Sequence, residues 1–239
     1  MTEALLFSLL AGLAMVVGGL VAALEHIRPD WLEREFRHTV IAFGGGALLA
    51  AVALVMVPDG VRNLSVAGTS GAFLVGAGFF LLADWMVARR GGSAAQLMAM
   101  LLDFVPEAIA LGAAFALASP AGPLLAFLIG LQNLPEGFNA YREMTARGSL
   151  TRRRVLTSFG FLSLLGPAAA WVGIVALADR PVQLARLMMF CAGGILYLTF
   201  QDIAPQAKLE HHWGPALGAV VGFLLGLVGQ MLLVGKGGV

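Results

Sequence analysis

The sequence predicts an all-α membrane protein of eight transmembrane helices, and three observations lead to this prediction. Apolar residues make up 59% of the 239-residue chain, charged residues make up 12%, and the mean hydropathy is +0.87. A soluble domain does not need that much apolar surface, whereas a bilayer does. The apolar residues form runs of about twenty, not the short alternating segments of a transmembrane barrel. Basic residues also gather in alternate connections between the runs.

The breaks between the runs fall at charges, prolines and glycines, and they define the spans in order. The first run follows Met1-Thr2-Glu3, an acidic start unlike a signal peptide, so we expect it to remain as a helix. The longest polar stretch is Glu25–His38, where Trp31 and Phe36 indicate a position at the membrane interface. The expected spans, which form one domain over residues 1–239, are 4–24, 39–57, 70–88, 95–118, 123–144, 155–178, 184–205 and 214–235.

The basic residues predict the orientation of the chain. Of the 15 Lys and Arg, only Arg62, Arg180, Arg186 and Lys236 fall on the side that carries both termini. The opposite side carries Arg28, Arg34, Arg37, Arg89, Arg90, Arg142, Arg147, Arg152, Arg153, Arg154 and Lys208. Because cytoplasmic loops are rich in Lys and Arg, we expect the N- and C-termini to lie outside the cell. The net charge of +1 gives no reason to expect a nucleic-acid partner.

Two patterns concern helix packing. Segments 43–58 and 190–205 both begin with Phe-x-x-Gly and end with proline, although their helices run in opposite directions, as in an inverted repeat. The last span carries glycine at every fourth position, which forms a small-residue face for close packing. That face suits packing within the chain and packing in a homodimer equally well. Its members are Gly214, Gly218, Gly222 and Gly226.

The most unusual residues are polar groups in the middle of apolar runs. Span 95–118 carries Asp103 and Glu107, and span 123–144 carries Gln132 and Glu136, each pair at i, i+4 spacing with proline before the glutamate. A charge at bilayer depth costs roughly 2.5–3.5 kcal/mol, so these groups are functional candidates. At about 1.5 Å per residue, Asp103 falls level with Glu136, and Glu107 level with Gln132. Since each pair shares one helix face, we expect the four groups to converge near the midplane as a site for a divalent metal ion.

Further polar residues suggest a route to and from this site. Asn139 and Glu143 continue the polar face of span 123–144 toward the cytoplasmic side, although packing within the bundle would also explain them. Asp59, at the outer end of span 39–57, either attracts cations to an entrance or belongs to a helix-ending turn. Asp202 either lines the inner exit or caps span 184–205. We interpret these four residues as the predicted transport path.

Several of these segments resemble ZIP-family (Zrt/Irt-like) divalent metal transporters of bacterial type. Gln132-Asn-Leu-Pro-Glu-Gly137 is similar to the signature of that family's fifth helix, and Asp103-Phe-Val-Pro-Glu-Ala108 to the His-Asn-x-Pro-Glu-Gly signature of its fourth. Weaker similarity extends over segments 42–51, 71–76 and 192–205, so the resemblance covers most of the chain. It implies a 3+2+3 bundle with an inverted repeat. It also implies a multi-pass protein of the bacterial plasma (inner) membrane that moves Zn²⁺ into the cytoplasm as a substrate, without an organic cofactor.

The resemblance also implies a ligand set. The primary metal site would consist of Asp103, Glu107, Gln132 and Glu136. The family's adjacent second site has lost its usual ligands, because Phe104, Gly166 and Gln201 occupy their positions. Asn133 and Gln201 remain as members of a secondary or vestigial metal site, and we expect one bound metal ion. Asp103 replaces the family's usual histidine, and an all-oxygen shell favours Fe²⁺ and Mn²⁺ more than histidine would. The resemblance keeps Zn²⁺ as the first expected substrate, with Fe²⁺, Mn²⁺ and Cd²⁺ as alternatives.

Two other functional classes stay open at this point. A transport-dead relative that acts as a metal sensor or scaffold would fit the eroded second site. An intramembrane hydrolase could use paired carboxylates as acid and base. The chain, however, has no Gly-x-Gly-Asp motif and no nucleophile–histidine pair within an expected span. We therefore expect a transporter and not an enzyme.

Overall fold

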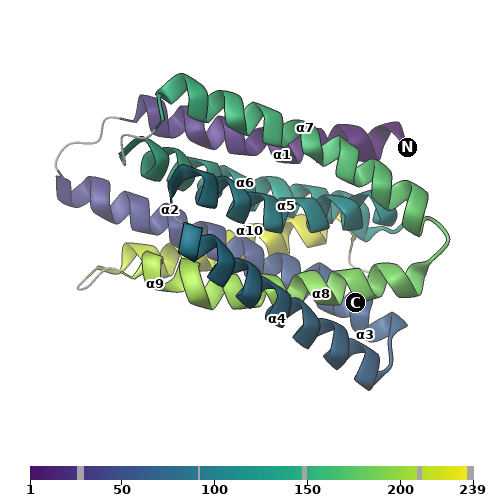
Figure 1. Ribbon diagram of the computed structural model, residues 1–239. Coiled ribbons are helices and arrows are strands. Elements are labelled where there is room, and N and C mark those ends of the chain that lie inside the picture. Colours follow the sequence, from purple (N-terminus) through teal and green to yellow (C-terminus); the bar gives the residue numbers. More distant parts are fainter. Residues whose placement is uncertain (26–29, 91, 147–149, 209–211, 236–239) are drawn as a thin grey trace.

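The computed structural model describes residues 1–25, 30–90, 92–146, 150–208 and 212–235. Within these ranges every regular element is a helix, and the helices lie side by side as the rods of one bundle (Figure 1). Each expected span corresponds to one rod. The rods are α1 (Thr2–Leu24), α2–η1–α3 (Asp30–Ala51, Val52–Met56, Val57–Asn63), α4 (Val66–Arg90), α5 (Gly92–Ala116), α6 (Ala121–Ala146), α7 (Arg152–Leu177), α8–η2–α9 (Pro181–Leu198, Thr199–Ile203, Ala204–Ala207) and α10 (Gly214–Leu233).

One boundary differs clearly from the expectation. The second rod begins at Asp30, so much of the polar stretch expected at the interface forms the first turns of α2. Polar residues do not stop a helix when no proline or glycine interrupts them. The residues before Asp30, 26–29, lie outside the described part of the chain. Arg28, Arg147 and Lys236 from the orientation argument lie outside it as well.

Seven of the described helical rods are long and apolar enough to cross a membrane, and the chain is therefore a multi-pass membrane protein. The rod that does not qualify by composition is α6, which carries Gln132, Asn133, Glu136 and Asn139. It is long enough to span, and its side chains are largely buried among the other helices. Polar residues are tolerated there because protein, not lipid, surrounds them.

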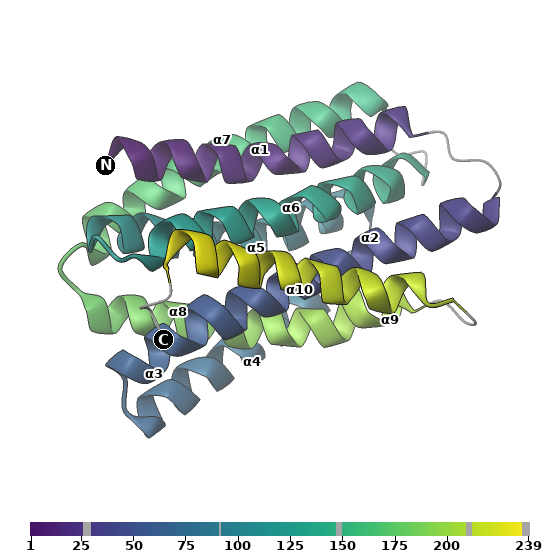
Figure 2. The ribbon, with the colours of Figure 1, turned by 180° about the vertical axis from the view of Figure 1, so that it is seen from behind.

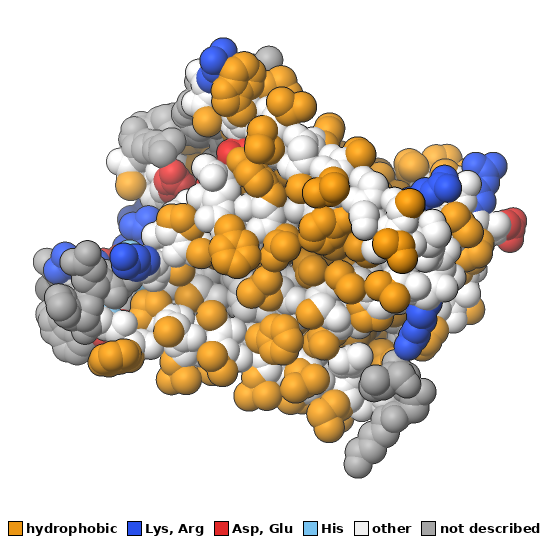
Figure 3. Space-filling model, turned by 90° about the horizontal axis from the view of Figure 1, so that it is seen from below, with side chains coloured by type: hydrophobic (Ala, Val, Ile, Leu, Met, Phe, Trp, Pro, Cys, Tyr) orange, Lys and Arg blue, Asp and Glu red, His pale blue; other side chains and the backbone are white. Residues whose placement is uncertain are grey.

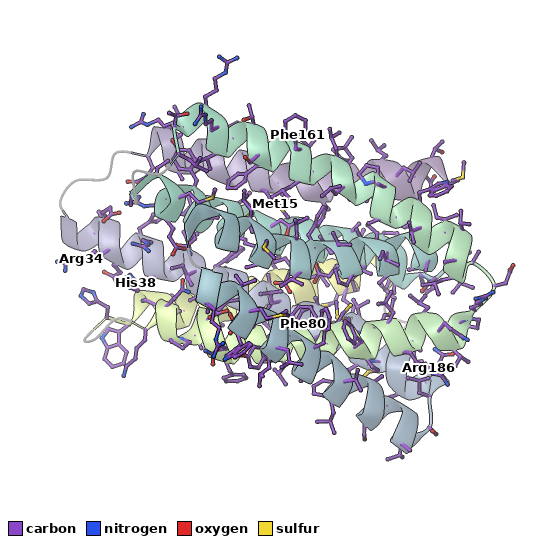
Figure 4. The ribbon with its side chains drawn as sticks, viewed as in Figure 1. Met15, Arg34, His38, Phe80, Phe161 and Arg186 are labelled. Atoms are coloured by element: carbon purple, nitrogen blue, oxygen red, sulfur yellow. The ribbon has the colours of Figure 1, made fainter. Side chains whose placement is uncertain are left out.

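The surface agrees with a protein embedded in lipid. Apolar side chains form a broad band, and charged side chains gather toward the two ends of the molecule (Figure 3). Arg34 and His38 lie at one end and Arg186 at the other (Figure 4). Phe161 points outward from α7 and is 72% exposed, whereas Met15 and Phe80 are buried between helices (Figure 4). The N-terminus lies at the same end as Arg186.

Two rods contain a π turn at matching positions. η1 precedes Pro58 and η2 precedes Pro205 at the same distance along the chain. A proline cannot donate an N–H to the carbonyl four residues earlier, and its ring clashes with that carbonyl. A wider π turn accommodates this conflict without breaking the rod. The repeated Phe-x-x-Gly…Pro pattern therefore corresponds to a repeated local structure.

Glycines allow two pairs of helices on one side of the bundle to touch backbone to backbone. In α1 and α6, a Cβ at Gly18 would lie 1.9 Å from the Leu134 carbonyl oxygen, and one at Gly137 would lie 2.2 Å from that of Met15. The same reciprocal arrangement joins α5 to α7. There, Cβ atoms at Gly112 and Gly173 would lie 1.9 Å and 2.0 Å from carbonyl oxygens of the opposite helix. No residue larger than glycine fits these positions without moving a helix.

The remaining long helices pair in the same way. Gly46 of α2 and Gly222 of α10 face each other's backbone, as do Gly193 of α8 and Gly76 of α4. The glycine face of α10 thus packs on α2 of the same chain. Gly218 contacts Thr39, and Gly226 contacts Ala50. Of the two roles that the sequence left open for this face, packing within the chain is the one observed. A homodimer stays a prediction.

Candidate metal centre

The two proline-glutamate turns meet at the centre of the bundle. Pro106 and Pro135 lie inside α5 and α6, which remain continuous helices through them. Gln132 Nε2 donates hydrogen bonds to Glu107 Oε1 (2.8 Å) and Oε2 (2.7 Å). Both side chains are nearly inaccessible, with Glu107 1% and Gln132 3% exposed. The pairing of these two residues across antiparallel helices, predicted from their depth, is confirmed.

A cavity of about 440 Å³ begins at this pair and extends toward the end of the bundle where α6 and α9 finish. Its walls come from α2, α4, α5, α6, α8, η2 and α9. The cavity brings together six of the residues singled out in the sequence. They are Asp103, Gln132, Glu136, Asn139, Glu143 and Asp202.

Three oxygen atoms on the cavity wall are buried and accept no hydrogen bond from the described residues. They are Asp103 Oδ1 and Gln132 Oε1 at the inner end and Asn139 Oδ1 further along α6. An unsatisfied buried acceptor costs about 1–3 kcal/mol, so native proteins rarely keep one without a purpose. Gln132 thus holds Glu107 with its amide nitrogen and presents its amide oxygen without a partner. Such acceptors suit a cation.

The carboxylates also act on one another. Asp103, Glu107 and Glu136 lie near enough for their charges to interact. Like charges at this depth repel strongly unless a cation or protons compensate. Even so, among the described residues no three His, Cys, Asp or Glu side chains form a cluster tight enough to hold a metal ion. Glu107 lies behind Gln132 and does not line the cavity. The four expected ligands therefore share one region without closing into a coordination shell.

The outer part of the cavity contains polar residues that the sequence argument did not assign to it. Asp84 of α4 lines the wall and accepts a hydrogen bond from Tyr197 Oη (3.0 Å). Gln206 of α9 also lines the wall, where its Oε1 accepts from Asn139 Nδ2 at 3.4 Å. The Arg89 guanidinium of the same helix lies over the Trp85 ring at 3.7 Å. Asp84 could have been identified because it, too, is a charge within an apolar run.

Besides Glu107, three predicted residues lie outside this cavity. Asn133 is buried and donates to the Ala11 carbonyl oxygen (2.9 Å), so its amide nitrogen joins α6 to α1. Gln201 is exposed on η2. Asp59 lies on α3 near the opposite end of the bundle, where its carbonyl and carboxylate oxygens accept from Asn63 Nδ2 at 2.9 and 3.3 Å. These contacts bring none of the three to the central pair.

The positions at which the sequence resemblance would place a second metal site, 104 and 166, are packed together. Phe104 is 1% exposed, and its ring lies against Gly12 of α1 and Gly166 of α7. A Cβ at Gly166 would lie 2.8 Å from Phe104 Cζ and 2.7 Å from the Ser8 carbonyl oxygen. The large residue at position 104 and the small one at 166 are therefore matched in volume. Phe104 and Gly166, which the sequence analysis considered separately, are therefore in contact.

No known protein-family model matches the chain, and a search of curated proteins finds no match.

Proposed function

We propose that the protein is a divalent metal cation transporter with a single site beside the Glu107–Gln132 pair. The observation that carries this proposal is the pair of unpartnered buried oxygens, Asp103 Oδ1 and Gln132 Oε1, at the inner end of a polar cavity. Together with the Glu136 carboxylate they offer an oxygen shell of the kind divalent cations accept. The proposed substrates are Zn²⁺, Fe²⁺, Mn²⁺ and Cd²⁺.

Transport would proceed by alternating access. In the proposed orientation, with both termini outside, the cavity opens toward the cytoplasm, so this conformation would release metal inward. A metal ion reaching Glu107 and Gln132 from outside would pass to Asp103 and Glu136. It would then leave past Asn139 and Glu143. Asp84 and Asp202 give the last part of the route a negative charge, which lowers the barrier for a departing cation.

The packing supports the inverted repeat that such a mechanism uses. The glycine contacts pair α1 with α6 as they pair α7 with α5, and α2 with α10 as they pair α8 with α4. Exchanging the first three rods with the last three, and α5 with α6, leaves this set of contacts unchanged. The Glu107–Gln132 pair lies where the two halves meet. We propose the 3+2+3 arrangement on this basis.

Flux into proteoliposomes tests the proposal directly. Asp103→Ala and Glu136→Ala should each lower Zn²⁺ uptake by more than about tenfold, because each removes an oxygen from the shell. Gln183→Ala, an exposed amide outside the cavity, should transport like the wild type. Uptake that is indifferent to both carboxylate changes would refute the assignment. A wild type that binds Zn²⁺ in calorimetry but carries no flux would be a sensor or scaffold instead.

Metal preference is tested in the same assay. Asp103→His should raise Zn²⁺ uptake relative to Mn²⁺, because imidazole suits zinc better than it suits manganese. Competitive uptake from a mixture of the four metals measures that ratio. A ratio equal to that of the wild type would remove Asp103 from the shell.

A further inference from the structure

A second hollow lies on the outside of the bundle. It has a volume of about 370 Å³ and runs between α2, the η2–α9 segment and α10, which lie together in Figure 2. Small residues create it, among them Ala42, Gly46, Ala204 and Ala216. Phe200 on its rim is 66% exposed, and Ala216 is exposed too, so this groove opens to the outer surface of the molecule.

One end of the groove is basic. Lys208 and His212 line it at the end of the bundle that also carries Arg34 and His38. His212 Nδ1 lies 3.2 Å from Glu35 Oε2, so the Glu35 carboxylate already contacts that histidine. Lys208 is exposed and has no ion-pair partner among the described residues. The groove therefore joins an apolar trough to a single available ammonium group.

We propose that this groove binds an anionic phospholipid, with one acyl chain in the trough and the phosphate at Lys208. The surrounding medium supplies the occupant: water cannot fill an apolar trough at bilayer depth, and an empty one would forfeit dispersion contacts on all its walls. A hydrocarbon chain restores those contacts. The basic end lies where headgroups begin, and a lysine near a membrane surface attracts anionic lipid. Trp213, 87% exposed beside His212, fits the same interface.

The bound chain would lie against the wall of the central cavity. Gly45 and Ile203 line both the groove and the cavity. A Cβ at Gly45 would lie 2.8 Å from Ile203 Cγ2, so Gly45 and Ile203 are in close contact and together separate the groove from the cavity. An acyl chain packed on Ile203 would hold that wall and the π turn that carries Asp202. The lipid site itself does not depend on whether the protein transports metal.

Retained lipid, counted by native mass spectrometry after detergent washing, tests the proposal. Wild-type protein reconstituted with phosphatidylglycerol should retain one lipid molecule after washing. The same protein reconstituted with phosphatidylcholine should retain none. Ala216→Leu fills the trough and should abolish retention, whereas Ala168→Leu, an exposed alanine on α7, should not. Lys208→Gln should weaken phosphatidylglycerol binding about fivefold, and Arg153→Gln, another exposed cation at the same end, should leave it unchanged.

Two results would overturn the proposal. Equal retention in wild type and Ala216→Leu would mean that no acyl chain uses the trough. Displacement of the lipid by soluble glycerol phosphate, which has no acyl chain, would reduce the site to a headgroup contact. Circular dichroism and a melting curve show whether Ala216→Leu is folded. If Ala216→Leu is not folded, the comparison of Lys208→Gln with Arg153→Gln decides, because both changes are on the surface. Equal weakening of lipid binding by these two variants would count against the site.

Discussion

At the scale of single residues, Gln132 and Phe104 shape the centre of the bundle. Gln132 satisfies the buried Glu107 carboxylate and leaves its own amide oxygen without a partner. Phe104 occupies the neighbouring space with an aromatic ring, against Gly12 and Gly166. Gln132 thus presents an unpartnered oxygen to the cavity, and Phe104 fills the space beside it with apolar atoms. A single metal ion per chain is the consequence that we expect.

The fit of Phe104 leads to a stability prediction. Phe104→Ala should lower the free energy of unfolding by about 3 kcal/mol, because the ring leaves a void between α1, α5 and α7 that rigid glycine contacts prevent from closing. Phe127→Ala is the matched control, since Phe127 is 40% exposed and lipid can replace its ring. Unfolding by denaturing detergent in mixed micelles measures both. Similar losses for the two variants would contradict the filled-site interpretation.

At the scale of elements, apolar run length was enough to predict every rod, and depth along two antiparallel helices was enough to predict the Glu107–Gln132 contact. Other features depend on contacts between distant segments. The Asn133 amide lies close to Gln132 in sequence, yet it is directed to the backbone of α1, which no pattern within α6 reveals. Asp84 reaches the cavity because α4 packs on α8, where Tyr197 meets it. α2 starts early, at Asp30, because the backbone continues as a helix through residues whose polar character did not indicate one.

The backbone contacts of α4 give a prediction at this scale. A Cβ at Gly76 would lie 1.9 Å from the Phe190 carbonyl oxygen, whereas a Cβ at Gly78 would have no atom within 4 Å. Gly76→Ala should therefore push α4 away from α8 and lower the melting temperature by several degrees, while Gly78→Ala, in the same helix, should leave it unchanged or raise it slightly. Differential scanning fluorimetry in detergent compares them. Equal melting temperatures would mean that α4 does not approach α8 so closely.

At the scale of the whole molecule, one end of the bundle is basic and polar, and the central cavity extends toward it. Arg142 of α6 pairs there with Glu25, at the end of α1, and with Glu33 of α2. These ion pairs join three rods beside the cavity, which Glu143 also lines. The side of the membrane that this end faces therefore decides to which side the cavity opens in this conformation.

Labelling with a membrane-impermeant maleimide establishes that side. Cys191 is 1% exposed and should not react, so the native chain should give no labelling signal of its own. Arg180→Cys, at the end that carries the N-terminus, should react in intact cells, and Arg153→Cys should react only after permeabilisation. The reverse pattern would make this conformation open to the outside and would contradict the proposed orientation.

The π turns have a further consequence for the cavity mouth. A π turn contains one residue more than an α turn, and one residue corresponds to about 100° of rotation about a helix axis. The extra residue in η2 therefore fixes how α9 is rotated about its axis. This rotation places Gln206 at the cavity. Deleting one residue from Thr199–Ile203 would present a different side chain at the mouth and leave Asp103 and Gln132 in place. The cavity mouth and the proposed metal site can thus change independently, the mouth by a change in chain length and the site only by substitution.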